Sequence, residues 1–132
     1  MDKRKSLKVI FYSLSLLLIS ACTSLDEYAI GVKEFSKLVD EKNCIVVDVR
    51  TPEEFLEGHI KGAATIDLYS ADFEHKFRFI NTSQCMALYC KEGYRSDKAL
   101  KILQEELGFK NLVHLKGGVT AWETDGYDLV EN

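Results

Sequence analysis

The sequence has no excess of positive charge, no internal repeat and no apolar run long enough to span a bilayer comfortably. Its 132 residues include 17 lysines and arginines against 21 aspartates and glutamates, a formal net charge of −4. A negative chain is repelled by nucleic acid, so nucleic acid is not an expected partner. Without a low-complexity tract or a sign of a second domain, the chain is expected to hold one folded domain.

The most apolar run lies near the amino terminus and is typical of a signal peptide. It is preceded by four basic residues, Lys3, Arg4, Lys5 and Lys8. The run from Val9 to Ile19 has nine apolar or aromatic residues among eleven, which suits a signal-peptide core better than a membrane span. The following Ile19-Ser20-Ala21-Cys22 resembles the lipobox of bacterial lipoproteins. This resemblance implies cleavage before Cys22 and attachment of lipid to it.

We therefore expect residues 1–21 to be a signal peptide with a lipobox, residues 22–29 a short tether and residues 30–132 the folded domain. The alternative is an uncleaved membrane anchor with an incidental cysteine. Either way, the domain is expected in the bacterial cell envelope, held to a membrane on its extracytoplasmic side. Cleavage would leave 13 basic and 20 acidic residues, a net charge of about −7. Membrane attachment would thus rest on lipid at Cys22 and not on a basic face.

Helical and strand patterns alternate along the rest of the chain. Spacing of apolar residues predicts helices over 32–41, 71–80 and 96–107, and apolar runs predict strands over 44–49, 63–68, 86–89 and 111–115. Thr51 and Pro52 open a short helix that Gly58 ends, and Gly117-Gly118 leads into a closing helix with Trp122 in the core. The alternation predicts an open, mostly parallel α/β sheet with helices on both faces and a functional loop at the carboxyl ends of its strands.

The segment from Ala87 to Ser96 places a cysteine between a strand and a helix. Cys90 leaves a buried strand and faces a helix N-terminus, whose unpaired N–H groups and dipole favour thiolate over thiol. Gly93 lets backbone N–H groups converge on one point, and Arg95 is expected to add a forked cation to the same cradle. These features predict a nucleophilic cysteine in an anion-binding loop. The alternative is a cysteine that closes a hydrophobic strand beside a surface arginine.

Three ordered motifs resemble the rhodanese-like domain family. The first runs from Asp48 to Phe55 and continues from Gly58 to Ala63, the second runs from Tyr89 to Ser96, and the third is Gly117-Gly118 with Trp122. The resemblance covers nearly all of the chain after the leader. It implies an open, mostly parallel five-stranded sheet with helices on both faces. It also implies a sulfurtransferase or sulfur carrier in which the loop cysteine becomes a persulfide.

The resemblance further implies roles for single residues. Cys90 would take sulfane sulfur from a small donor such as thiosulfate and pass it to a thiol or to cyanide. Substrate binding is expected from the residues that follow it: Lys91, Glu92, Gly93, Tyr94, Arg95 and Ser96. Asp48, Arg50 and His59 are expected to support the loop without reacting. No cofactor or metal is expected, because His75 and His114 lack metal-ligand spacing and are assigned to surface or strand-edge positions.

Other functions and partners stay open at this point. A phosphatase or arsenate reductase also places cysteine and arginine on an oxyanion loop, although the four residues between Cys90 and Arg95 make a tighter bowl than five would. A non-catalytic docking module is the second alternative. Lys91 would attract an anionic donor and Glu92 would repel one, so charge does not select the donor. We expect a monomer, and whether a redox partner protein supplies electrons is left open.

The family resemblance also implies a disulfide. In the family's sheet order, the strands that follow Cys44 and Cys85 are neighbours, so both cysteines would lie at the amino ends of adjacent parallel strands. We hypothesise a Cys44–Cys85 bridge, which suits an oxidising compartment, with Cys90 a strand length away and free. The alternative is two buried, reduced cysteines.

Overall fold

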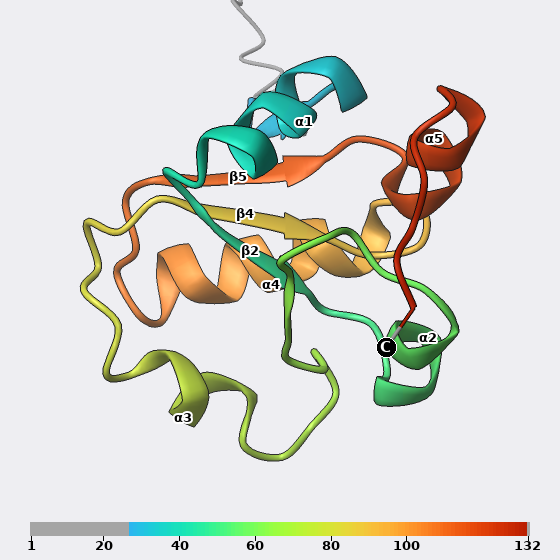
Figure 1. Ribbon diagram of the computed structural model, residues 1–132. Coiled ribbons are helices and arrows are strands. Elements are labelled where there is room, and N and C mark those ends of the chain that lie inside the picture. Colours follow the sequence, from blue (N-terminus) through green and yellow to red (C-terminus); the bar gives the residue numbers. More distant parts are fainter. Residues whose placement is uncertain (1–26, 132) are drawn as a thin grey trace, which may run out of the picture.

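The computed structural model describes residues 27–131, so the predicted signal peptide, Cys22 and most of the predicted tether lie outside the described residues. Strands and helices alternate along the described chain (Figure 1). In order they are β1 (Ala29–Ile30), α1 (Val32–Glu41), β2 (Ile45–Asp48), α2 (Pro52–Glu57), β3 (Ala64–Thr65), α3 (Phe73–Phe77), β4 (Met86–Tyr89), α4 (Tyr94–Glu105), β5 (Leu112–Leu115) and α5 (Gly118–Thr124).

The strands form a five-stranded sheet in the order β1-β5-β4-β2-β3, and each neighbouring pair is parallel. β4 lies in the middle, where Leu88 pairs with Val47 on one side and His114 on the other. All four of its residues are buried. A parallel strand covered on both faces reads as an unbroken apolar run, which is why the sequence predicted residues 86–89 as a strand with these bounds.

Helices cover both faces of the sheet, which confirms the predicted fold class. Figure 1 shows α1 and α4 on opposite sides of the strands. On one face, Phe77 of α3 and Leu103 of α4 pack with Leu88. On the other face, the ring of Phe35 in α1 packs against the ring of Tyr89 and against the ring of Trp122 in α5. The prediction that Trp122 lies in the core is confirmed, since its side chain is 5% exposed.

The peripheral elements are shorter than predicted, and one was missed. β3 pairs with β2 through Ala64 and Thr65 alone, where a strand over 63–68 was expected. α3 covers only Phe73–Phe77, where a helix over 71–80 was expected, and the ring of Phe79 beyond its end is 86% exposed. β1 consists of two residues, too few to show a period. It brings Ala29 into the sheet, although the sequence had placed that residue in the tether.

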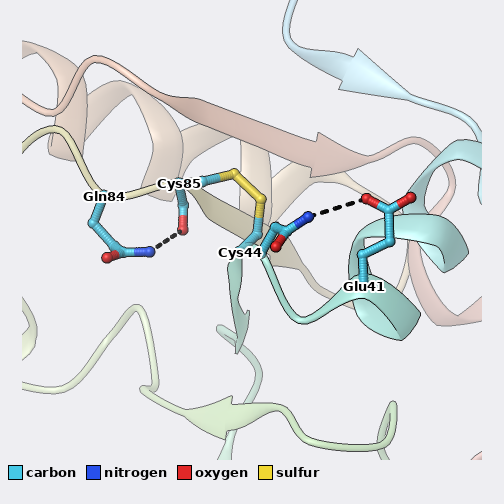
Figure 2. Close-up of a disulfide and its surroundings, with 5 residues drawn as sticks. Glu41, Cys44, Gln84 and Cys85 are labelled. Carbon is cyan, nitrogen blue, oxygen red and sulfur yellow. Dashed lines mark hydrogen bonds between the residues drawn. A yellow bond between two sulfur atoms is a disulfide. The ribbon is translucent and has the colours of Figure 1, made fainter.

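A disulfide joins Cys44 and Cys85 at the amino ends of β2 and β4, as hypothesised (Figure 2). The register pairs Ile45 with Met86, so the residues that precede them face each other with Cα atoms 4.6 Å apart. The N–H of Ile45 also donates to the carbonyl of Cys85 at 2.9 Å. Cys90, at the opposite end of β4, is the free cysteine among the described residues.

Between residues 27 and 131, no helix is both long and apolar enough to cross a membrane.

Candidate active site

Cys90 lies directly after β4 and is 1% exposed. Its Sγ accepts a hydrogen bond from the N–H of Gly93 at 3.1 Å. Gly93 has φ of +103° and is the N-cap of α4, so the chain turns back toward the sulfur within three residues. This turn needs a positive φ, which glycine adopts without steric cost. The helix begins at Tyr94, two residues before the predicted start, so Arg95 and Ser96 belong to its first turn.

The start of α5 forms hydrogen bonds to the backbone of the Cys90 loop. The N–H groups of Val119 and Thr120 donate to the carbonyls of Cys90 and Lys91 at 2.9 and 3.0 Å. A Cβ atom on Gly118 would overlap the backbone of Cys90 and Lys91. The paired glycines of the third motif therefore allow α5 to approach the loop closely and to satisfy its carbonyls.

A buried polar pair lies behind the sulfur. Ser96 Oγ is 3.6 Å from Cys90 Sγ, donates to the carbonyl of Gly93 at 3.0 Å and lies 3.0 Å from Nδ1 of His114. Ser96 is fully buried and His114 is 5% exposed. The prediction that His114 occupies a surface or strand-edge position is wrong, because β5 lies inside the sheet between β1 and β4. Strand edges cannot be recognised from sequence when the covering strand is only two residues long.

Arg95 binds Glu54 of α2 instead of pointing its fork at the sulfur, which corrects the predicted role. Its Nη1 and Nη2 atoms lie 2.7 and 2.8 Å from the two carboxylate oxygens of Glu54. This bonding lowers the pKa of Glu54 to about 2. The same bond, together with the nearby charge of Cys90, raises the pKa of Arg95. The two oxygens of a carboxylate match the two donors of a guanidinium fork, which a single sulfur atom cannot do. The fork of Arg95 therefore turns toward Glu54.

Asp48, Arg50 and His59 support α2 through hydrogen bonds and a ring contact. The Nε and Nη2 atoms of Arg50 donate to the Asp48 carboxylate, and Nη2 also donates to the carbonyl of Gly58 at 2.6 Å. His59 Nδ1 lies 3.0 Å from the carbonyl of Phe55, whose ring stacks on the imidazole. These contacts fix the carboxyl-terminal end of α2, the helix that carries Glu54.

The remaining predicted binding residues lie at the mouth of the loop. Lys91 and Glu92 are exposed, and the ring of Tyr94 is 81% exposed. Sequence reasoning missed Glu54 and His114 as members of the site. Glu54 had one local signal, its place three residues after Thr51 in a capping box, where its N–H and carboxylate both bond to Thr51. No group of three potential metal ligands occurs in the part of the chain that the structure describes.

The fold and the cysteine loop together define a domain of the rhodanese type. The sequence model of the rhodanese-like domain family matches residues 31–125. This chain therefore belongs to that family of sulfurtransferases.

Curated relatives carry the same domain alone or inside longer proteins. Thiosulfate sulfurtransferase GlpE of Pseudoalteromonas translucida is 28% identical over 102 residues, which cover 77% of this chain and 94% of that protein. A sulfurtransferase of Allochromatium vinosum is 29% identical, with 71% of this chain and 85% of the other covered. A tRNA uridine(34) hydroxylase of Pelagibacter ubique is 33% identical over 68% of this chain, which spans only 30% of that relative.

Solved structures show the same fold. A rhodanese-related protein from Thermoplasma volcanium superposes with a TM-score of 0.68 at 28% identity, covering 79% of this chain and 98% of the other. A rhodanese-like domain protein from Staphylococcus aureus superposes with a TM-score of 0.66 at 30% identity, covering 79% and 97%.

Proposed function

We propose that this chain moves sulfane sulfur through a persulfide on Cys90, taking it from a donor such as thiosulfate and delivering it to a thiol or to cyanide. The observation that carries the proposal is the geometry at Cys90. A buried sulfur at the N-terminus of α4 accepts the Gly93 N–H and has the Ser96 hydroxyl beside it. The Gly93 N–H and the positive end of the α4 dipole stabilise negative charge on the first sulfur and on the second one that it receives.

The chemistry balances without an external oxidant or reductant. The Cys90 thiolate attacks the outer sulfur of thiosulfate, a new S–S bond forms, and sulfite leaves with the electron pair of the bond that breaks. An acceptor thiolate or cyanide then attacks the outer sulfur of the persulfide and releases the Cys90 thiolate. The roles of Cys90 and of the loop from Lys91 to Ser96 in these steps are part of the proposal.

Mass spectrometry of the full-length chain tests the proposal. After incubation with thiosulfate, the protein should gain the mass of one sulfur atom, and cyanide should remove that mass as thiocyanate. Cys90→Ala should gain nothing. If the unsubstituted protein also gained no sulfur from thiosulfate, mercaptopyruvate or polysulfide, the domain would act as a docking module and the proposal would be wrong.

We also propose that the domain works in the bacterial cell envelope, held to a membrane by lipid on Cys22. The lipobox-like sequence before Cys22 supports this placement. The Cys44–Cys85 disulfide does so independently, because disulfides persist in oxidising compartments and are rare in the cytosol. The amino-terminal peptide of protein purified from membranes should begin at Cys22 and carry acyl chains. Residues 1–21 still attached to an unmodified Cys22 would contradict the anchor.

A further inference from the structure

The carboxylate of Glu54 occupies the cationic fork that the cysteine loop would otherwise offer to an anion. Its two oxygens bond to both terminal nitrogens of Arg95, and the side chains of the pair are only 26% and 22% exposed. Glu54 Oε2 also accepts the N–H of Thr51 at 3.0 Å, which fixes the carboxylate in place. An arginine held in this bidentate way no longer presents its paired donors to a sulfonate or phosphate.

The charges around the sulfur then give no net attraction for a dianion. With Cys90 as thiolate, the formal charges of Cys90, Lys91, Glu92, Arg95 and Glu54 sum to −1. Lys98 lies one turn after Arg95 on α4. Its ammonium group lies over the ring of Tyr69, 5.2 Å from the ring centre. The remaining attraction comes from the N-terminus of α4, equivalent to roughly half a positive charge. The net charge of the whole chain, −4, adds a weak repulsion.

From this arrangement we propose that Glu54 determines donor specificity, so that the site favours sulfane-sulfur donors of low charge, the organic persulfides, over sulfonated dianions such as thiosulfate. The inference rests on the proposed sulfur transfer through Cys90 and deepens it. A persulfide carries at most one negative charge at its reacting sulfurs, and its leaving group is a thiolate. Neither the persulfide nor its thiolate leaving group needs an arginine whose paired donors are free.

The reaction with a persulfide is balanced. The Cys90 thiolate attacks the outer sulfur of R–S–SH, and a new S–S bond forms to Cys90. The bond between the two donor sulfurs breaks, and the inner sulfur leaves as a thiolate with the bonding electron pair. The donor's proton stays on the transferred sulfur. The site therefore has to stabilise one negative charge throughout, whereas thiosulfate brings two.

Sulfur loading of Cys90 tests the inference through the glutamine variant of Glu54. Full-length protein in detergent is mixed with excess thiosulfate or with the hydropersulfide of 2-mercaptoethanol, and the fraction carrying an extra sulfur is followed by mass spectrometry. Glu54→Gln keeps the side-chain volume and the capping box while removing the charge. Its ratio of loading efficiency, thiosulfate over persulfide, should rise about five- to tenfold, mainly through a lower half-saturating thiosulfate concentration.

Glu53→Gln is the matched control, because it removes one negative charge from an exposed position of the same helix. Its ratio should stay at that of the unsubstituted protein. An equal ratio in all three proteins would overturn the specificity inference and leave the proposed function intact. Absence of loading by either donor in the unsubstituted protein would overturn both.

A salt titration of the unsubstituted protein gives an answer even if Glu54→Gln does not fold. Salt screens charge interactions over about 10 Å at 0.1 M. If repulsion limits thiosulfate, added salt should lower its half-saturating concentration. An increase with salt would mean that the loop attracts the dianion and would overturn the inference.

Discussion

Ser96 Oγ and His114 Nδ1 lie 3.0 Å apart, buried behind the Cys90 sulfur. The hydroxyl has a single proton, and it also contacts the carbonyl of Gly93 and, at 3.6 Å, Cys90 Sγ. When His114 carries its proton on Nδ1, it donates to Ser96 Oγ and orients the hydroxyl. Ser96 Oγ then accepts from the Cys90 thiol while its own proton bonds to the Gly93 carbonyl. After Cys90 loses its proton, the hydroxyl has to turn away from that carbonyl to donate to the thiolate.

Removal of the Ser96 hydroxyl should therefore slow the reaction of Cys90 with iodoacetamide. We expect Ser96→Ala to reduce the rate roughly three- to tenfold at fixed pH, the cost of one hydrogen bond to the sulfur. His114→Leu should slow it less, and His114→Asn, which retains an N–H donor, should restore most of the rate. If His114→Leu and His114→Asn reacted equally, the imidazole would have only a packing role.

The Glu54–Arg95 pair predicts a stability loss in acid. The pKa of Glu54 is lowered from 4.5 to about 2 in the folded state, so its contribution is fully present above about pH 4.5. The contribution should disappear as the pH falls from about 4.5 to about 2, since the unfolded chain binds the proton first. Urea unfolding across this range should show a smaller acid-induced loss in Glu54→Gln than in the unsubstituted protein. A loss of equal size in both would contradict the prediction.

The disulfide should stabilise the fold substantially. Cys44 and Cys85 are 41 positions apart, and closing a loop of this size contributes about 3 to 4 kcal/mol in the chain-entropy model. Cys44→Ala/Cys85→Ala should lower the free energy of unfolding by this amount in a denaturant titration. A reductant should destabilise the unsubstituted protein and leave the variant unchanged. Two free thiols beyond Cys90 in unreduced, lipidated protein would contradict the bridge.

Asp48 and Arg50 should matter for stability more than surface ion pairs do. Asp48 is fully buried and Arg50 is 5% exposed, so Asp48→Asn would leave a buried guanidinium without its counter-charge. Loss of one partner of a buried pair costs about 3 to 5 kcal/mol in the free energy of unfolding. Asp72→Asn, which removes a partner from the exposed Lys76–Asp72 pair, is the control and should have little measurable effect. Equal effects would contradict the supporting role.

Gly118 should be required for the geometry of the cysteine loop. Gly118→Ala places a methyl group against the backbone of Cys90 and Lys91 at a φ of +57°. Displacement of a nucleophile by about 1 Å can cost roughly a hundredfold in rate, so sulfur loading of Cys90 should fall steeply. Gly126→Ala is matched, because its φ is +84° but no atom lies within 4 Å of the new methyl group. It should lose stability and keep sulfur loading.

Most of the fold could be predicted from local patterns in the sequence. The helix over Val32–Glu41 and the strand over Met86–Tyr89 have the predicted bounds, since burial of one helix face leaves a period in the sequence and burial of both strand faces leaves an unbroken apolar run. The Thr51 cap was equally visible, because its partner Glu54 lies three positions away. β1 and the short β3 left no such period, and their bounds depended on pairing with β5 and β2.

The sequence by itself determined the order of strands and helices after β1, the cysteine at the end of a buried strand and the glycine that turns the chain toward it. These features depend on neighbours within a few positions. Only the tertiary structure decided that Arg95 binds Glu54, 41 positions away, and that Ser96 meets His114 from another strand. Such pairs are chosen by geometry and burial when helices dock on the sheet, and no local pattern records them.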